Sequence, residues 1–412
     1  MYRFLENDRV AWKGILAPHQ EATAQRCCEL GTVVVPHDTT FCSFDGDREG
    51  LGPIAGNKRG FGAHFSLAVS CDARRAPLGV IALSPFVRED RPRLRTKAER
   101  SARTIETRAI PRDDKESARW WRGVVEVDER LGPDVSCIHV MDQEADDYAL
   151  LASLVGGAHR FVVRGSAERR LERQGARVSD VLDTVEASAF RTVPLTARTK
   201  PGPNHSARRE RIATLEIRAT AIEIRRPQHA QHDAPQVQLH VVQVFEPSPP
   251  TNAERIEWTL YTTEPIRTAD ELIAIVDYYR ARWRIEEYFK ALKTGCAYEK
   301  RQLESLAALL RALALLAPIA WHLLAIRTLA HEAGGEPASL VVDDIQLEVL
   351  RFLAPHHRMP ARPSVRDVFL AIAAVGGHIR QNGEPGWLVL GRGFDDFVKA
   401  EAVWRAAAAA KK

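Results

Sequence analysis

One short segment concentrates residues that could bind a metal ion or a phosphate. Residues 278–295 read YYRARWRIEEYFKALKTG. At about 100° per residue, a stripe about 80° wide on a helix collects a tyrosine, an arginine, a carboxylate and two lysines. These are Tyr279, Arg282, Glu286, Lys290 and Lys293. The carboxylate could hold a hard cation and the basic groups a phosphate. A solvated helix face with ion pairs to Glu286 is the alternative interpretation.

Two further acids follow short apolar runs. The run 32–35 leads through Pro36 and His37 to Asp38, and the run 135–141 (VSCIHVM) ends at Asp142. Both runs predict buried strands with an acid at the end. Phosphodiester transfer needs its developing charge neutralised and two oxygens held in line, which two divalent ions about 3.5–4 Å apart can do. Three carboxylates around an open site suit Mg²⁺.

The surrounding pattern predicts an α/β chain. Helical spacing marks the first thirty residues as short helices, and strands follow at 61–70, 78–83 and 160–164, with helices at 116–127 and 146–155. Strand–helix–strand order around Asp142 predicts a parallel unit. Period-two alternation at 212–224 and 237–245 predicts an all-β insertion. The alternation of the first run shifts near Ala221-Ile222, which suggests two strands or a bulge. Thr268 and Glu271 form a capping box that starts the helix ending at Gly295.

The helix spacing resembles a known family. Tyr279, Arg282, Glu286 and Lys293 match Y-(2)-R-(3)-E-(6)-K, the signature of the insertion-sequence-four family of bacterial transposases. Further segments resemble the same family in order along nearly the whole chain: Tyr2-Arg3-Phe4, His37-Asp38-Thr39-Thr40, Met141–Asp146, Arg160–Arg164, Glu257-Trp258 and Gly376-Gly377.

The resemblance implies an RNase H-like core, a mixed sheet flanked by helices, with an all-β insertion and a C-terminal helical domain. We expect five parts: an N-terminal helical remnant (1–30), the first part of the core (31–188), the β-rich insertion (189–265), the core helices (266–330) and a dimerisation domain (331–412).

The resemblance also implies an activity and a site. Asp38, Asp142 and Glu286 would hold two Mg²⁺ ions, which Mn²⁺ could replace, with Asp38 bridging both. The implied function is cut-and-paste DNA transposition through a hairpin intermediate and strand transfer. Tyr279, Arg282, Lys290, Lys293, Arg164, Trp258 and Arg3 would contact DNA. A homodimer would form on DNA, with no nucleotide cofactor. Trp258 would stack on a flipped base, the alternatives being a core aromatic for Trp258 and a solvated arginine for Arg164.

Composition fits a cytoplasmic protein without a membrane partner. Lys and Arg total 58 against 54 acids, so charge alone does not decide for or against nucleic acid. The six cysteines form no C-x-x-C pair and predict reduced thiols. The apolar stretch 312–326 is shorter than the about 20 residues that a membrane span needs, so we predict a buried helix. The Arg-rich segment 88–119 could contact DNA or form a solvated loop.

About thirty residues precede the first predicted catalytic strand, where the family carries an end-recognition domain. We therefore expect weak recognition of transposon ends, with catalysis intact. The alternatives are a truncated regulatory form that inhibits full-length transposase through mixed dimers, and the remnant of a decayed element. A structure-selective nuclease on the same fold and a non-enzymatic DNA-binding module are the rival classes.

Overall fold

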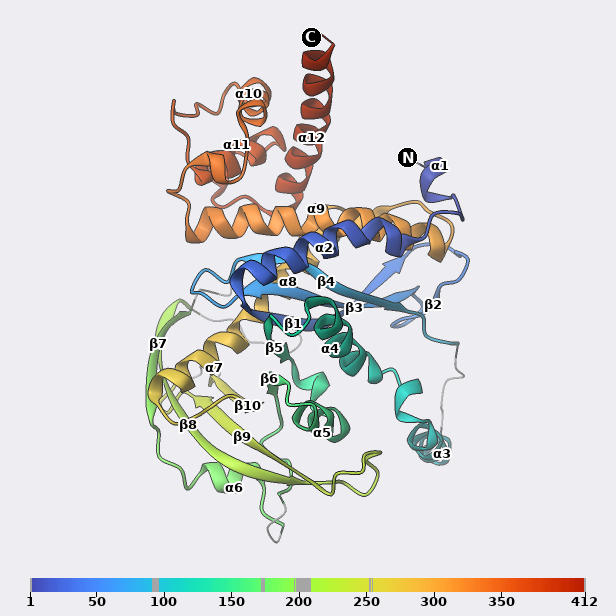
Figure 1. Ribbon diagram of the computed structural model, residues 1–412, viewed down its shortest axis with the longest axis vertical. Coiled ribbons are helices and arrows are strands. Elements are labelled where there is room, and N and C mark those ends of the chain that lie inside the picture. The colour runs from blue at the N-terminus through green and yellow to red at the C-terminus, as the bar shows by residue number, and fades with distance from the viewer. Residues whose placement is uncertain are drawn as a thin grey trace.

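A computed structural model of the chain describes residues 2–90, 96–171, 175–195, 197, 209–251, 253 and 255–410 (Figure 1). Part of the predicted Arg-rich segment, residues 91–95, and the predicted break at 201–205 lie outside these residues. The six cysteines are free, as predicted.

The described strands form one ten-stranded mixed sheet. Its strand order is β2-β3-β1-β5-β6-β10-β9-β8-β7, with β4 paired to β3. Strands β1, β5 and β6 are mutually parallel and the other pairs are antiparallel. The strands are β1 (Thr32–Phe44), β2 (Gly52–Pro53), β3 (Arg59–Ser70), β4 (Pro77–Phe86), β5 (Ser136–Met141), β6 (Arg160–Arg164), β7 (Ala189–Leu195), β8 (Arg211–Arg225), β9 (Gln236–Phe245) and β10 (Glu257–Thr262).

Helices cover both faces of the sheet. Helices α7, α8 and α9 pack on one face, and α4, α5 and α6 pack on the other. The helices are α1 (Tyr2–Leu5), α2 (Trp12–Leu30), α3 (Lys97–Ala109), α4 (Ala118–Leu131), α5 (Tyr148–Gly156), α6 (Val178–Leu182), α7 (Ala269–Ala281), α8 (Trp283–Lys290), α9 (Leu306–Glu332), α10 (Asp344–Leu353), α11 (Val365–Val375) and α12 (Trp387–Ala409). The mixed sheet flanked by helices and the helical C-terminal part are confirmed.

The first strand corrects the sequence prediction. It runs through Phe44 instead of ending before Asp38, because its far half continues to pair with β3 after its pairing with β5 ends at Pro36. Asp38 therefore lies in the middle of a strand, whereas Asp142 directly follows β5. The N-terminal region is also simpler than predicted, since α2 is a single helix of 19 residues.

The predicted bulge in β8 is wrong. Strand β8 pairs with β9 in one register from Glu216 to Arg225. The apparent shift has another cause: Ala213, Leu215 and Ile217 join the core on one face of the sheet, and Ile222 and Ile224 join the core on the other. A regular strand thus buries alternate faces at its two ends.

The helix that carries the candidate motif is segmented. Its predicted start is confirmed, because Thr268 and Glu271 form a reciprocal capping box. Near Arg282 the chain passes from α7 to α8, where the Ile285 backbone N–H donates a hydrogen bond to the Arg282 carbonyl three residues back. A π-helical turn, η3 (Ala291–Gly295), follows α8. The spacing of about 100° per residue that an α-helix keeps therefore does not extend to Lys293.

Helix α9 is much longer than the predicted apolar run, with 27 residues. It is the one helix in the described part of the chain long and apolar enough to cross a membrane, by length and composition only. However, 56% of that apolar window is buried inside the protein. Figure 1 shows α9 lying between the sheet layer and helices α10 to α12, with α2 alongside. These contacts fit the prediction of a buried core helix.

The Arg-rich connection contains a helix that the sequence analysis missed. Helix α3 begins at a Thr96–Glu99 capping box and has no buried residue. Figure 1 shows it at the edge of the molecule. Its start is fixed locally, by its own cap, and its faces are exposed.

Candidate active site

The three predicted acids come from β1, the end of β5 and α8, and one arginine joins two of them. Arg282 Nη1 lies 3.3 Å from Asp38 Oδ2. Its Nη2 donates to Glu286 Oε1. A guanidinium that forks between two carboxylates brings β1 and α8 together through charge-assisted bonds. The ion pair between Arg282 and Glu286 that the alternative interpretation predicted is therefore present, but it also includes Asp38.

Asp142 completes the acidic group. Its Oδ1 accepts a hydrogen bond of 2.9 Å from the Glu144 amide, which fixes the side chain at the start of the turn η2 (Gln143–Ala145). Its negative charge acts on Asp38. Burial and the neighbouring charge of Asp142 raise the pKa of Asp38 to about 7, against the lowering effects of Arg282 and the Thr39 amide.

This electrostatic balance fits a cation site. Asp38 has a side-chain exposure of 17% and Glu286 of 30%, so the oxygens are recessed but reachable. Carboxylate oxygens are the donors that a hard divalent ion prefers. Asp38, Asp142 and Glu286 are therefore candidate ligands for a divalent metal ion, and Arg282 is the present counter-charge of Asp38 and Glu286.

Three of the predicted DNA-contact residues lie next to this group. Tyr279 is buried, and its hydroxyl accepts a hydrogen bond from Arg164. The nearby charges of Arg282 and Asp142 also influence its pKa, in opposite directions. The rings of Trp258 and Tyr279 lie 5.6 Å apart between centroids. Burial raises the pKa of Tyr279, so it stays a neutral hydrogen-bonding phenol. The ring of Trp258 is partly buried and packs against the core, as its alternative interpretation predicted. Its stacking on a flipped base stays a prediction.

The other three predicted residues are placed differently. Lys290 is exposed, with its ammonium 4.9 Å from the Trp283 ring centroid. Lys293 donates to the Phe41 carbonyl at 2.6 Å, and so reaches β1 beyond Asp38. Arg3 is exposed on α1, which packs against α9 and is drawn well apart from α7 in Figure 1. The common stripe predicted for Lys290 and Lys293 is therefore not kept, because the helix changes its winding.

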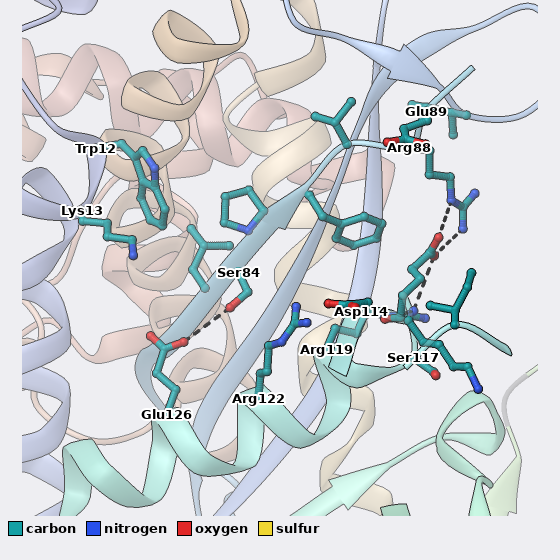
Figure 2. A pocket seen from close by; sticks show the side chains of 18 of the residues that line it. Trp12, Lys13, Ser84, Arg88, Glu89, Asp114, Ser117, Arg119, Arg122 and Glu126 are labelled. Atoms are coloured by element: carbon teal, nitrogen blue, oxygen red, sulfur yellow. Dashed lines mark hydrogen bonds and ion pairs between the residues drawn. The ribbon is translucent and has the colours of Figure 1, made fainter. Parts of the chain in front are cut away.

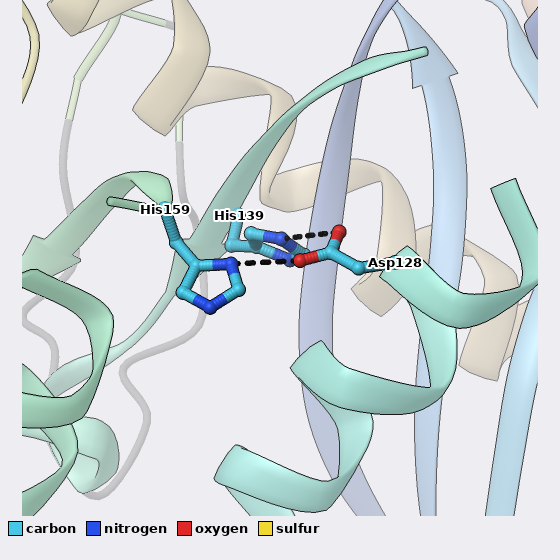
Figure 3. A group of neighbouring side chains, drawn as sticks. All are labelled: Asp128, His139 and His159. Carbon is cyan, nitrogen blue, oxygen red and sulfur yellow. Dashed lines mark hydrogen bonds and ion pairs between the residues drawn. The ribbon is translucent and has the colours of Figure 1, made fainter. Parts of the chain in front are cut away.

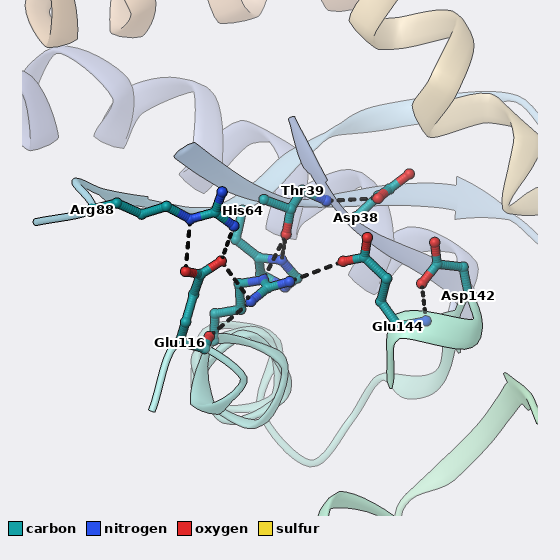
Figure 4. Close-up of polar contacts among 8 residues, drawn as sticks. Asp38, Thr39, His64, Arg88, Glu116, Asp142 and Glu144 are labelled. Atoms are coloured by element: carbon teal, nitrogen blue, oxygen red, sulfur yellow. Dashed lines mark hydrogen bonds and ion pairs between the residues drawn. The ribbon is translucent and has the colours of Figure 1, made fainter. Parts of the chain in front are cut away.

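A polar network beside Asp38 was missed by the sequence analysis. Arg119 Nε donates to Thr39 Oγ1 at 2.9 Å, and its Nη2 to Glu144 at 3.0 Å. Figure 4 shows this network extending to a fork between Arg88 and Glu116. The available signal was the Arg-rich segment itself, whose last arginine is Arg119. Nothing local in the sequence pairs it with Thr39.

A groove of 1380 Å³ leads away from this network (Figure 2). Its walls come from α2, β4 and α4, and Arg119 belongs both to the groove and to the network at Thr39. The groove is mixed in charge with a basic majority: Lys13, Arg88, Lys115, Arg119, Arg122 and Arg130 against Glu89, Asp114, Glu116 and Glu126. Such a lining can follow a phosphate backbone.

Comparison with known proteins shows which family the chain belongs to. A cryo-EM structure of the piggyBac transposase synaptic complex with hairpin DNA aligns at 11% identity and a TM-score of 0.35, over 75% of this chain. The chain spans about half the length of that transposase, and the likeness is distant. A much more direct match joins residues 92–321 to the family described as transposase DDE domain, a range that includes Asp142 and Glu286 and begins after Asp38. Since the match covers more than half of the 412 residues, the chain belongs to the transposase DDE domain family.

Proposed function

We propose that this chain is a DNA transposase that cuts and joins DNA with divalent metal ions. Asp38, Asp142 and Glu286 are its catalytic carboxylates. The observation that carries the proposal is the contact of Arg282 with both Asp38 and Glu286, at a position where Asp142 also acts on Asp38. Two central strands and a facing helix thus contribute one acid each.

Asp38, Asp142 and Glu286 would hold the divalent ions, for which we propose Mg²⁺. When bound, they stabilise charge on the scissile phosphate and favour ionisation of the attacking oxygen. The residues of the chain supply the frame. Asp142 is fixed by the Glu144 amide and Asp38 by the Thr39 amide, at 2.9 and 2.7 Å. These bonds limit the directions in which the carboxylate oxygens point.

Arg282 has two roles in this proposal. Without a cation it neutralises Asp38 and Glu286, which keeps two carboxylates close together at low cost. In the reaction, the same guanidinium would fork onto a phosphate beside the cleaved bond. Tyr279 and Arg164, joined by their own hydrogen bond, bind the adjacent backbone.

The finer features rest on the sequence motif and on these neighbours. We propose an RNase H-like core, membership of the insertion-sequence-four family, a hairpin intermediate whose flipped base stacks on Trp258, and a dimer assembled on DNA in the cytoplasm. The proximity of Trp258 to Tyr279 supports the stacking role. The basic majority of the groove beside Arg119 supports a path for DNA toward Asp38.

A plasmid assay tests the proposal. The purified chain is incubated with Mg²⁺ and a supercoiled plasmid carrying the inverted repeats that flank its gene. We expect nicked and joined products that disappear in Asp142→Asn and Glu286→Gln, whose folds are checked by circular dichroism. Cleavage without joining would favour the structure-selective nuclease. Wild-type protein that binds DNA but never nicks it would contradict catalysis and favour the regulatory form.

A further inference from the structure

A second polar group lies on the opposite face of the same central strands. Asp128 on α4, His139 on β5 and His159 just before β6 converge, as Figure 3 shows. His139 Nε2 lies 3.1 Å from Asp128 Oδ1, and His159 Nδ1 lies 2.7 Å from Asp128 Oδ2. One potential ligand atom from each residue lies within 4.8 Å of the others. Three separate elements thus direct nitrogen and oxygen donors at one point.

The second ring nitrogen of His139, Nδ1, already has a hydrogen-bond partner. His139 is 1% exposed, and its Nδ1 is hydrogen-bonded to His37 Nε2 at 2.9 Å. The other nitrogen of His37 meets Ser66 Oγ at 2.9 Å. Metal-bound histidines characteristically have their second ring nitrogen held in this way, since it fixes the tautomer and the ring orientation. With a metal on Nε2, the ring proton of His139 is on Nδ1, which donates a hydrogen bond to His37 Nε2.

The spacing and the donor types agree with a tetrahedral ion. Bond lengths of about 2.0–2.2 Å from zinc to nitrogen or oxygen place tetrahedral ligand atoms about 3.3 Å apart. The observed separations of 3.1 and 2.7 Å, each to a different oxygen of Asp128, are shorter than this, so the carboxylate would have to turn and withdraw to share one ion with both rings. Two imidazole donors favour a zinc-like ion over magnesium.

The site is closed on one side and open on the other. The rings of Trp121 and His159 meet edge to face, with centroids 5.5 Å apart. Asp128 and His159 retain side-chain exposures of 32% and 19%. An ion can therefore reach the carboxylate and His159 from solvent and meet the buried His139 behind them.

We propose that Asp128, His139 and His159 form a structural site for a zinc-type transition-metal ion. The site is separate from the carboxylate site of the proposed transposase reaction. The ion would tie α4 to β5 and to the segment that enters β6. Because β5 leads directly to Asp142, and His37 directly precedes Asp38, occupancy would stiffen the frame that carries both acids.

The experiment measures metal binding by the whole chain, expressed without a polyhistidine tag. Zn²⁺ affinity is determined by competition with a chromophoric chelator, and Co²⁺ is used as a spectroscopic probe of coordination. Wild-type protein is expected to bind one Zn²⁺ and to give the intense visible absorption of tetrahedral Co²⁺. His159→Ala and Asp128→Asn are each expected to lose more than the about 10–100-fold that removal of an outer partner of a metal ligand costs.

Matched controls separate this site from its surroundings. His229→Ala removes an exposed histidine outside the cluster and is expected to leave Zn²⁺ affinity unchanged. Glu286→Gln should abolish nicking without changing Zn²⁺ affinity, so the two proposals fail independently. Circular dichroism checks each fold, and the two ligand variants back each other up. Equal Zn²⁺ affinity in wild-type, His159→Ala and Asp128→Asn proteins would overturn the site and leave a hydrogen-bonded histidine cluster.

Discussion

His37 and Asp38 are neighbours on β1, yet they belong to opposite sides of the sheet. The pleat of a strand points successive side chains to opposite faces. Asp38 meets Arg282 on the side of α8, whereas His37 meets His139 and Ser66 on the side of α4. One strand therefore contributes to an oxygen-rich group on one face and to a nitrogen-rich group on the other.

The difference between the two faces is one of charge state as well as of donor type. Burial and Asp142 raise the pKa of Asp38, and burial, together with His139 and His64, lowers the pKa of His37. Both buried groups thus favour their neutral forms. On the face of α8, Arg282 partly lowers the pKa of Asp38 again, and on the face of α4, Asp128 partly raises that of His37. Burial and the charge of Arg119 lower the pKa of His64, on the same face as His37, to about 3.

The largest expected effect is on the oxygen-rich face. Asp142→Asn should reduce Mg²⁺-dependent nicking by at least about a thousandfold, because loss of a group at the reacting centre removes most of the catalysis. Nicking is measured on supercoiled plasmid. Asp147→Asn, which alters a nearby acid that caps α5, is the matched control and should retain activity. Equal loss in both variants would mean that damage to the fold explains the effect.

Next comes the pH response of the nitrogen-rich face. The folded-state pKa of His64 is depressed, so the unfolded chain takes up a proton near pH 6.5 while the folded chain stays neutral down to about 3. Stability is therefore present above pH 6.5 and is lost as pH falls. The loss should be about 2 kcal/mol between pH 6.5 and about 4.5. Denaturant unfolding of His64→Gln should show a shallower acid dependence than wild-type protein; identical slopes would contradict this assignment.

Arg282 tests whether the bridge between two acids matters for the reaction. Arg282→Ala should lower nicking about a hundredfold, the equivalent of about 2.7 kcal/mol. Arg282→Lys should recover only part, because an ammonium lacks the planar fork. Without metal, Arg282→Ala should also unfold at a lower temperature, and Mg²⁺ should restore much of the difference. Full activity of Arg282→Ala would contradict a role beyond the ion pairs.

The smallest expected effect probes how tightly the histidine face is packed. A Cβ at Gly123 would lie 2.9 Å from His64 Nε2 and 3.2 Å from His37 Nδ1. Gly123→Ala should therefore destabilise the fold by about 1–2 kcal/mol through overpacking. Gly14→Ala, with open space around its Cβ, should be neutral or slightly stabilising. Equal melting temperatures of wild-type protein and Gly123→Ala would show that the side chains of His64 and His37 can shift to make room for the added methyl group.

The sequence predicted the elements better than their ends. Local signals, such as the Thr268–Glu271 cap and the alternation in the late strands, are encoded within a few residues and were confirmed. The extent of β1 depends on its partner β3, so the placement of Asp38 at a strand end was wrong. The π-turn after Lys290 likewise moved Lys293 off the predicted stripe.

The candidate site was partly predictable for the same reason. A spaced motif on one helix pointed to Arg282 and Glu286, and acids after apolar runs pointed to Asp38 and Asp142. Arg119 and the histidines carry no such spacing. Asp128, His139 and His159 come from a helix, a strand and a connection, so only the fold brings their donor atoms together.

The continuity of the ten-stranded sheet has a consequence for shortened versions of this chain. Strand β10 pairs with β6 on one side and with β9 on the other, so it joins strands β7 to β9 to β6 through main-chain hydrogen bonds. Removal of β7 to β10 would leave one edge of β6 with unpaired main-chain amides and carbonyls, which could pair with a strand of another molecule. Loss of this region should therefore show first as self-association, before any loss of chemistry.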